Sequence, residues 1–268
     1  MKRTINFIGG MHRKNEEGAM LLSDFNIEFN GTSRDVVVNS DKILGVTGSV
    51  TMYGPSMDLH TISKINGEVV NLLSQWNVDC VRYLNPESNA IALPFPVNVE
   101  KFKPSIKDDI PMLYFKQRDQ DILKDVFEFL IKKYNNIRFF HYEQGYNEND
   151  YLDACSKSPF CIWLGRHESQ GFALQECLSS DTPIFVIDVE SMLDEIDRYG
   201  NRPWINGPFL KATAAPYFDK RCGIKTDVDN WKEDFDVFIE NLEKYSPRSY
   251  VVEELSGEAL SKKWLEHI

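Results

Sequence analysis

The sequence predicts an α/β protein whose parallel sheets carry helices on both faces. The second half of the chain alternates short apolar runs, which are typical of buried strands, with amphipathic runs of helical period. The first apolar run, residues 4–8, ends at the glycine pair Gly9-Gly10, where a tight turn joins the first strand of such folds to a helix. Because open parallel sheets bind ligands outside the carboxyl ends of their strands, we expect function at strand ends.

Composition sets the limits for this prediction. At 268 residues the chain exceeds one average domain but would make two unusually small ones, and both arrangements remain open at this point. A hydrophobic content of 42% and a charged content of 26% are typical of a globular protein with a core. The net charge of -11 would repel a polyphosphate backbone, so we expect no nucleic acid partner.

The cysteines and the N-terminal region indicate the compartment. The chain has five cysteines and no C-x-x-C pair, which argues against a disulfide framework and against a zinc cluster. The apolar run before Gly9 is too short for a signal sequence or a membrane span. We therefore expect a soluble, cytoplasmic protein that does not span a membrane.

The first half of the chain predicts few elements. After the strand at residues 4–8, further strands are expected at residues 36–38, 43–46 and 91–93. Apolar residues at helical spacing predict one amphipathic helix between residues 54 and 77. The prolines Pro94, Pro96 and Pro104 then predict an extended connection, where we place a domain boundary.

The second half alternates regularly between the two kinds of element. Strands are expected at residues 112–115, 137–141, 160–164 and 183–186. Helices are expected between them, at residues 120–133, 149–156 and 171–178. Two further helices, near residues 231–245 and 252–267, are expected to end the chain. This order predicts a parallel sheet covered by helices on both faces.

The most informative stretch is residues 163–186, which read WLGRHESQGFALQECLSSDTPIFV. A strand should end near Leu164 and a helix should begin near Gly171, which places free backbone N–H groups at the carboxyl end of a strand. Such a helix start binds anions. Glu168 precedes the helix and Glu176 lies within it, so the two carboxylates need not share one task.

This stretch resembles the signature of family 4 retaining glycosyltransferases. In that family two glutamates separated by seven residues flank a Gly-Phe-x-Leu turn, and a proline-led strand follows. The matching residues here are Glu168, Gly171, Phe172, Leu174, Glu176 and Pro183. The segment PFPVNVEKFKP at residues 94–104 is similar to the family's interdomain connector. The resemblance covers about two thirds of the chain, and the first domain would be shorter than usual for the family, as in compact enzymes encoded by large viruses.

The segment MLYFKQR at residues 112–118 is a third point of resemblance. The family places an arginine and a lysine there, and both hold the diphosphate of the donor. Lys116 and Arg118 occupy this region, although the family more often has the arginine first. The sequence therefore leaves open which of the two residues does which task.

The resemblance implies a GT-B architecture, with two facing Rossmann-like domains, parallel sheets and a deep interdomain cleft. Residues 1–98 would form the acceptor-side domain, completed by a C-terminal helix at residues 252–268. Residues 110–250 would form the domain that binds the donor nucleotide. Closure of the cleft on donor binding is expected at a hinge within residues 97–111.

The resemblance also implies the reaction. A hexose would pass from a nucleotide-diphosphate sugar to a glycan or other hydroxyl acceptor with retention of configuration, GDP-mannose being the favoured donor and UDP-glucose the next. Lys116, Arg118 and the helix start at Gly171 would neutralise the leaving diphosphate, so no divalent metal and no tightly bound cofactor is expected. Glu168 would accept hydrogen bonds from the sugar hydroxyls, and Glu176 would hold the ribose diol.

Further residues are expected to line the site. Those expected to bind the donor beside the two glutamates are Ser169, Gln170, Gly171, Phe172, Ala173 and Leu174. Tyr142 and Tyr146 would border the base. Gly9 and Gly10 would let their loop approach the phosphates or the acceptor, and His12 would reach the same cleft. A homodimer is left open, and a virus-encoded enzyme would work in the host cytoplasm.

Two other functions remain as alternatives. The short first half would fit a non-catalytic module that binds sugar nucleotides or saccharides on a degenerate transferase scaffold. A Rossmann-type oxidoreductase or epimerase would need a third glycine after Gly9-Gly10, and the sequence lacks it. The Asp-x-Asp tripeptide of metal-dependent transferases occurs at residues 119–121, 227–229 and 234–236, and this repetition indicates acidic composition rather than a metal site.

Overall fold

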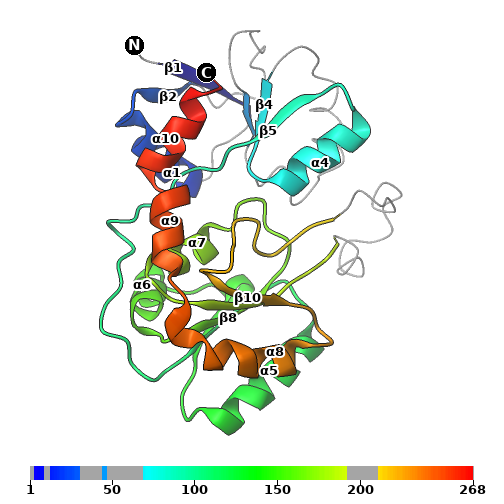
Figure 1. Cartoon of the computed structure of the whole chain (residues 1–268), viewed down its shortest axis with the longest axis vertical. Helices are drawn as coiled ribbons and strands as arrows, with labels where there is room; N and C mark the ends of the chain where they lie inside the picture. The colour runs from blue at the N-terminus through cyan, green and yellow to red at the C-terminus, as the bar shows by residue number, and fades with distance from the viewer. Residues whose placement is uncertain (1–2, 9–12, 31–43, 47–68, 192–210, 268) are drawn as a thin grey trace. The chain divides into compact units, whose positions relative to one another are not determined.

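The computed structural model describes residues 3–8, 13–30, 44–46, 69–191 and 211–267 (Figure 1). The chain divides into two compact units. Unit 1 comprises Met1–Asn98, Pro203–Lys211 and Glu254–Ile268. Unit 2 comprises Val99–Arg202 and Ala212–Glu253. Each unit contains one five-stranded parallel sheet, so the predicted α/β class with parallel sheets is confirmed.

The sheet of unit 2 has the strand order β10-β9-β8-β6-β7. Its strands are β6 (Met112–Lys116), β7 (Arg138–His141), β8 (Cys161–Gly165), β9 (Ile184–Ile187) and β10 (Gly223–Thr226). Every residue of β6, β8 and β9 is buried, as expected for the central strands of a sheet that is covered on both faces. The edge strand β10 was not predicted, because its sequence GIKT is too short and too polar to form an apolar run.

Helices cover both faces of this sheet (Figure 1). The helices of unit 2 are α5 (Gln120–Lys133), α6 (Glu148–Lys157), α7 (Phe172–Ser179), α8 (Trp231–Glu240) and α9 (Pro247–Glu254). Short 3-10 helices follow β7 and α8, as η1 (Tyr142–Gln144) and η4 (Leu242–Lys244). In Figure 1, α5 and α8 lie on one side of β8 and β10, and α6 and α7 lie on the other.

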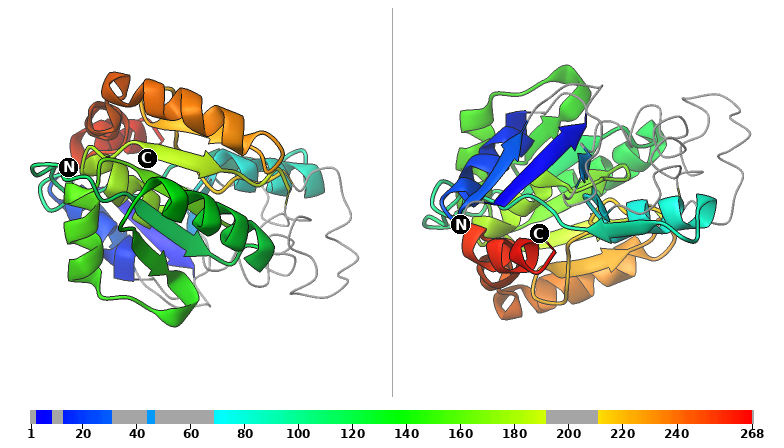
Figure 2. Two further views of the ribbon diagram at one scale, coloured as in Figure 1. Left: turned by 90° about the horizontal axis from the view of Figure 1, so that it is seen from below. Right: turned by 90° about the horizontal axis from the view of Figure 1, so that it is seen from above.

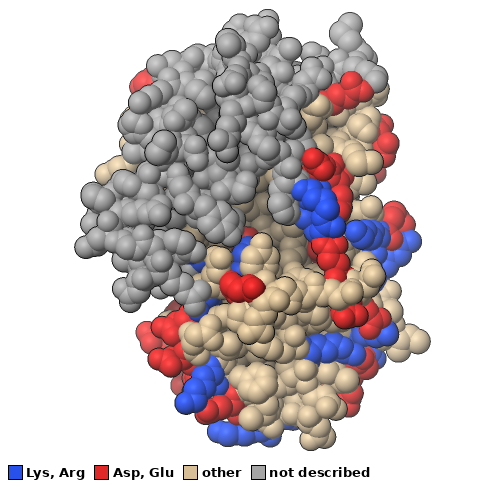
Figure 3. Space-filling view, turned by 180° about the vertical axis from the view of Figure 1, so that it is seen from behind, with Lys and Arg blue, Asp and Glu red and all other residues tan. Residues whose placement is uncertain are grey.

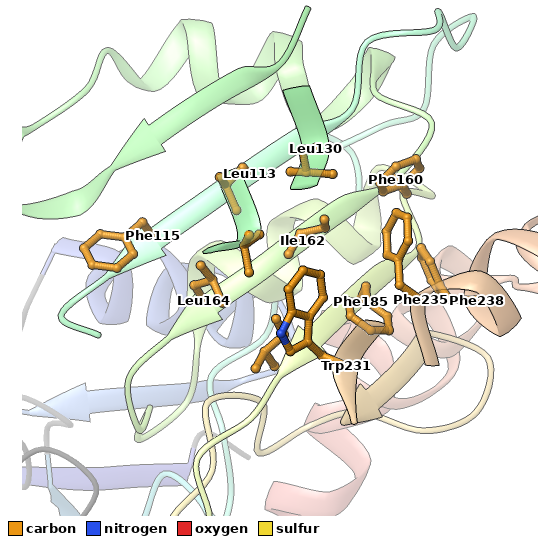
Figure 4. Packing of buried hydrophobic residues seen from close by; sticks show 12 residues of the cluster. Leu113, Phe115, Leu130, Phe160, Ile162, Leu164, Phe185, Trp231, Phe235 and Phe238 are labelled. Atoms are coloured by element: carbon orange, nitrogen blue, oxygen red, sulfur yellow. The ribbon is translucent and has the colours of Figure 1, made fainter. Parts of the chain in front are cut away.

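The alternation of side chains along β6 separates a core from a site. Leu113 and Phe115 point into the cluster that α5 and α8 cover, together with Phe185 and Phe235 (Figure 4). Tyr114 has the opposite direction, since its ring stacks on that of Trp163 with centroids 4.0 Å apart. Lys116 follows Tyr114 by two residues, so the strand brings it to the face that α6 and α7 cover.

The sheet of unit 1 has the strand order β2-β1-β3-β4-β5. Its strands are β1 (Arg3–Ile8), β2 (Ile27–Asn30), β3 (Leu44–Val46), β4 (Val69–Leu72) and β5 (Asn89–Ala92). Figure 2 shows β1 and β2 side by side with their arrows in the same direction. The helices described in this unit are α1 (Arg13–Ser23), α4 (Gln75–Leu84) and α10 (Gly257–Leu265).

The C-terminal helix α10 is part of the core of unit 1. The indole of Trp264 is fully buried, and its Nε1–H donates to the carbonyl of Pro94 at 3.2 Å. The same ring lies 5.5 Å from that of Phe29 and 6.3 Å from that of Phe95. The last turns of the chain therefore pack on the segment that leaves β5.

Several predicted elements need correction. The helix expected between residues 54 and 77 is wrong at residues 69–72, where the chain forms β4, and α4 begins only at Gln75. A short apolar run such as VVNLL fits a buried strand as well as a helix, so its periodicity could not decide. The helix expected at residues 252–267 is two helices, separated at Ser256, which caps α10. The strand expected at residues 36–38 lies outside the described residues.

The connector at residues 94–104 contains no helix or strand, in agreement with its prolines. Arg248 at the start of α9 fixes it to unit 2. Its guanidinium donates to the carbonyls of Val99 at 3.1 Å and Phe102 at 2.9 Å, and to that of Ser179 at the end of α7 at 2.7 Å. Arg248 thereby holds the C-terminal end of α7 to the connector.

Gly18 in α1 provides a test of packing in unit 1. A β-carbon at this position would lie 2.6 Å from Cβ of Phe95, a distance that requires the two elements to shift. Helix propensity alone would make alanine better than glycine by about 1 kcal/mol. We expect Gly18→Ala to destabilise the protein instead, by about 1–3 kcal/mol of unfolding free energy, because overpacking dominates. Urea denaturation measures this, with Met20→Ala on the exposed face of α1 as the control. A stabilised Gly18→Ala protein would contradict the packing.

Candidate functional site

The strand order places the candidate site in unit 2. From β6 the chain forms β7 on one side and then crosses to β8 on the other. In such sheets the carboxyl ends of the two strands at this switch of direction form the usual ligand site. Here these are the ends of β6 and β8, at Lys116 and Gly165. The first sheet has the same order, but Gly9, Gly10 and His12, which follow β1, lie outside the described residues.

A buried ion pair occupies this position. The Nζ atom of Lys116 lies 2.6 Å from Oε1 of Glu168, and each residue is 6% exposed. The backbone supports both partners, since the N–H of Arg166 donates to the carbonyl of Lys116 at 2.9 Å and the N–H of Glu168 to that of Thr213 at 2.9 Å. Burial of two charges costs free energy that their attraction only partly offsets. A pair of this kind at a strand end is weak evidence for stability and better evidence for function.

Arg118 lies next to this pair but is used differently. It follows Gln117, whose φ of 53° turns the chain sharply after β6. Its NH1 group donates to the carbonyl of Gly165 at 3.2 Å and to that of Ile187 at 2.8 Å, at the ends of β8 and β9. Arg118 is 4% exposed, and its guanidinium places a fixed positive charge at the carboxyl edge of the sheet. Lys116 and Arg118 are thus brought together at one edge, with Lys116 bonded to a side chain and Arg118 to backbone.

The start of α7 lies against Glu168. Gly171, the N-cap, has φ 80° and ψ 50°, a left-handed conformation that favours glycine. A β-carbon there would lie 3.6 Å from Cβ of Glu168, so the helix start and the glutamate are in close contact. Ser169 and Gln170 are buried in the loop between them. The N–H groups of the first turn lack helical acceptors, so this end of α7 adds positive potential to the site.

The remaining predicted residues of α7 divide into two kinds. Leu174 is 1% exposed and belongs to the core, while Phe172 is only partly buried. The carbonyl of Ala173 accepts a hydrogen bond from the hydroxyl of Tyr151 at 2.7 Å. Glu176, in the second turn, is 5% exposed and is close enough to Tyr146 to affect it electrostatically.

The two predicted tyrosines have different surroundings. Tyr142 is 41% exposed, and Lys116 Nζ lies 4.6 Å from the centre of its ring. Tyr146 packs against the rings of Phe140 and Tyr151 at 5.4 Å and 5.2 Å. Burial, with a smaller contribution from Glu176, raises the pKa of Tyr146 to about 12. Tyr142 is therefore accessible at the surface beside Lys116, whereas Tyr146 is packed among other aromatic rings.

Sequence reasoning missed part of this site. Arg166 and His167 are 6% and 2% exposed and lie in the same loop as Glu168. Burial, and then the positive charges of Arg166 and Lys116, holds the pKa of His167 well below 6.5. The position of both residues beside Glu168 was a signal that could have marked them. The turn at residues 213–216, in which the carbonyl of Thr213 accepts the N–H of Glu168, contains no motif, so no pattern in the sequence marks it.

Charges elsewhere are dispersed. Figure 3 shows basic and acidic side chains interspersed over the described part of one face, without a large area of one sign. Within the described residues, no group of three or more His, Cys, Asp or Glu side chains is arranged to hold a metal ion. None of the helices that the structure describes has the length and apolar character needed to cross a membrane. The five cysteines are buried and unbridged.

Comparisons with known proteins define the fold. No family model and no curated protein matches the chain. Among solved structures, Anabaena HepE in complex with UDP-glucose is 8% identical over 98% of both chains, with a TM-score of 0.56. Sucrose-phosphate synthase from Thermosynechococcus elongatus is 13% identical over 98% of this chain and 71% of its own, with a TM-score of 0.54.

S. aureus TarM, in a complex that contains UDP, is 14% identical over 79% of this chain, with a TM-score of 0.54. The chain spans 45% of the length of TarM. At such identities the likeness concerns the fold alone. These proteins are GT-B glycosyltransferases, and the chain has the GT-B fold.

The lowered pKa of His167 has a consequence for stability. An unfolded chain takes up a proton at this histidine near its ordinary pKa of 6.5, whereas the folded protein does so only at a much lower pH. The unfolded state therefore binds more protons below pH 6.5, and the free energy of unfolding decreases as the pH is lowered, by up to about 1.4 kcal/mol per pH unit. We expect His167→Gln to reduce this fall between pH 6.5 and 5, measured by urea denaturation.

The control for this experiment is His267→Gln, which changes an exposed histidine near the end of the chain. Carboxylates titrate alike in both variants, so the difference between them isolates His167. An identical pH dependence in the two variants would show that His167 is not buried in its neutral form.

Proposed function

We propose that the chain is a glycosyltransferase that moves a hexose from a nucleotide-diphosphate sugar to a glycan or other hydroxyl acceptor, with retention of the anomeric configuration. The observation that carries this proposal is the buried Lys116–Glu168 pair at the switch point of the second sheet. A cation suits a diphosphate, and a carboxylate suits sugar hydroxyls. The GT-B fold supports the same class of reaction.

The positive groups at the strand ends would stabilise the leaving group. Departure of a nucleoside diphosphate develops negative charge on its terminal phosphate, and preorganised donors in a water-poor site stabilise that charge by a factor of about 10² to 10³ each. Lys116, Arg118 and the first turn of α7 are such donors. Because they supply positive charge, the proposed reaction needs no divalent metal and no tightly bound cofactor.

Glu168 would change partner when the donor binds. Without donor, its carboxylate neutralises Lys116 at 2.6 Å. A donor phosphate would share Lys116, and the oxygens of Glu168 would then accept hydrogen bonds from the hydroxyls of the sugar. The ion pair therefore holds both side chains at the correct place before the donor arrives, which reduces the cost of ordering them on binding.

The other end of the donor would lie along α7 and η1. Glu176, which is buried at the second turn of α7, would accept hydrogen bonds from the ribose diol. The exposed ring of Tyr142 would border the base. The family resemblance favours GDP-mannose, then UDP-glucose. The structures of HepE and TarM contain UDP-glucose and UDP, so both donors belong in the assay.

The proposed reaction exchanges one bond for another at the anomeric carbon. The bond from this carbon to the diphosphate oxygen breaks, and a bond to the acceptor oxygen forms on the same face. The proton of the acceptor hydroxyl passes to the departing phosphate oxygen. In this scheme Glu168 positions the sugar and does not attack it. The family resemblance assigns the acceptor to residues 1–98, and Gly9, Gly10 and His12, which would contribute to its site, lie outside the described residues.

Calorimetry with GDP-mannose, UDP-glucose and NAD tests the donor site. We expect saturable binding of one sugar nucleotide, unchanged by EDTA. Lys116→Met should weaken it by about 10- to 100-fold, because a charged hydrogen bond to phosphate contributes about 1.5–3 kcal/mol. The matched control is Lys232→Met, which breaks an exposed ion pair with Asp125 in the same unit. Binding of NAD alone would favour the oxidoreductase alternative.

Glu168→Gln separates sugar recognition from phosphate recognition. If Glu168 accepts bonds from the sugar, the variant should bind the sugar nucleotide about tenfold more weakly, since a lost acceptor costs about 1–3 kcal/mol. Its affinity for the plain nucleoside diphosphate should fall much less. Equal losses for the two ligands would place Glu168 away from the sugar.

The stereochemistry of transfer is tested by NMR of the product. With an α-linked donor, we expect an α-linked glycoside and release of one nucleoside diphosphate per sugar transferred. A β-linked product would contradict retention. Binding without transfer or donor hydrolysis, across a broad acceptor screen, would favour the non-catalytic binding module.

A further inference from the structure

Asp188 lies directly after β9 and organises a turn that is distant in sequence. Its carboxylate accepts hydrogen bonds from the hydroxyl of Thr213 at 2.6 Å and from the N–H of Ala214 at 2.6 Å. It also accepts the N–H of Val189 at 2.9 Å. The side chain of Asp188 is only 18% exposed, so these bonds are made in a site with little water. The carboxylate thereby fixes the first residues of the turn to the carboxyl edge of the sheet.

Lys225 on β10 completes the network from the other side. Its Nζ donates to the carbonyl of Ala215 at 2.7 Å and to Oγ1 of Thr213 at 3.2 Å, and it lies 3.6 Å from Asp188. The N–H of Ala215 donates to Oγ1 of Thr213 at 3.0 Å. The turn is therefore held by an anion at its start, which follows β9, and by a cation at its end, which lies on β10.

This turn contacts the loop of the candidate site. The carbonyl of Thr213 accepts the N–H of Glu168 at 2.9 Å. Two residues after Ala214, the ring of Pro216 lies 3.8 Å from where a β-carbon of Gly171 would stand. Thr213 is therefore bonded on one side to Asp188 and on the other to Glu168. A single residue connects the Asp188 carboxylate with the glutamate that pairs with Lys116.

We propose that Asp188 is a positioning residue, which sets the backbone of Glu168 through the turn at residues 213–216. The carboxylate is not needed to hold Asp188 beside β10, since the N–H of Asp188 donates to the carbonyl of Thr226 at 2.8 Å. Loss of the carboxylate releases the turn and leaves β9 and β10 paired. Its effect on donor binding rests on the function proposed above.

Amide hydrogen exchange in the absence of ligand tests the proposal. In Asp188→Ala, exchange at the Glu168 amide should accelerate by roughly tenfold or more, because a local opening that exposes its bond to Thr213 becomes easier. The amide of Arg166 is an internal reference, since it bonds the carbonyl of Lys116 and not the turn. Asp188→Asn, which keeps one oxygen for the turn, should have a smaller effect.

Thr213→Val and Asp236→Ala complete the set of variants. Thr213→Val keeps the shape of the side chain but removes the hydroxyl that donates a hydrogen bond to Asp188. This variant should reproduce the faster exchange at the Glu168 amide. Asp236 forms an exposed ion pair with Lys133, so Asp236→Ala controls for the loss of a charge. Unchanged Glu168 exchange in both Asp188→Ala and Thr213→Val would overturn the proposal, as would equal acceleration at Glu168 and Arg166.

A second measurement connects the turn to the donor. Asp188→Ala should weaken binding of the sugar nucleotide that the wild type binds by roughly tenfold, and this loss should largely disappear in a Glu168→Gln background. Additive losses would show that Asp188 does not act through Glu168. If the wild type binds neither GDP-mannose nor UDP-glucose, the proposed function fails, while the exchange experiment still decides the role of Asp188.

Discussion

The burial of opposite charges where parallel strands end is the constraint on which the second unit depends. Parallel strands that are covered on both faces are mostly apolar, and both β8 and the first four residues of β6, Met112–Phe115, fit this rule. Their carboxyl ends, however, leave carbonyl groups that need donors. Arg118 donates to the ends of β8 and β9, and Lys116 reaches Glu168. Positive charge is therefore concentrated at the one edge where this fold binds ligands.

Burial of the Lys116–Glu168 pair costs free energy of folding, so stability alone does not explain it. Replacing a buried ion pair with apolar residues is often neutral or stabilising by about 1–4 kcal/mol, so stability alone would not retain Lys116 and Glu168. His167 beside them is held neutral by burial and by the positive charges of Arg166 and Lys116, which lower its pKa, so this part of the site disfavours a further positive charge. An anionic ligand, as proposed above, would add a partner for the cations at this edge beside Glu168 and the strand-end carbonyls.

The sequence predicted the second sheet well because its central strands are continuous apolar runs separated by helices of clear period. It failed where local pattern and tertiary context disagree. The run that contains Leu72 and Leu73 has both helical and strand character, and only pairing with β5 decides between them. The helix α1, which was not predicted, contains Gly18. Glycine lowers helix propensity, but a β-carbon at this position would lie 2.6 Å from Cβ of Phe95.

The same distinction applies to the site. Lys116 ends a recognisable strand, Arg118 and Glu168 follow recognisable strands, and Glu176 lies in the helix that comes next, so the order of elements could predict where these residues lie. The contact between Glu168 and Thr213 could not be predicted in this way, since the two residues are far apart in sequence and the bond uses only backbone atoms. A hydrogen bond between backbone atoms requires no particular residue type, so the sequence contains no sign of it. A motif can therefore predict which side chains contact a ligand. It cannot predict the contacts that position those side chains, because the partners of residues such as Asp188 are distant in sequence.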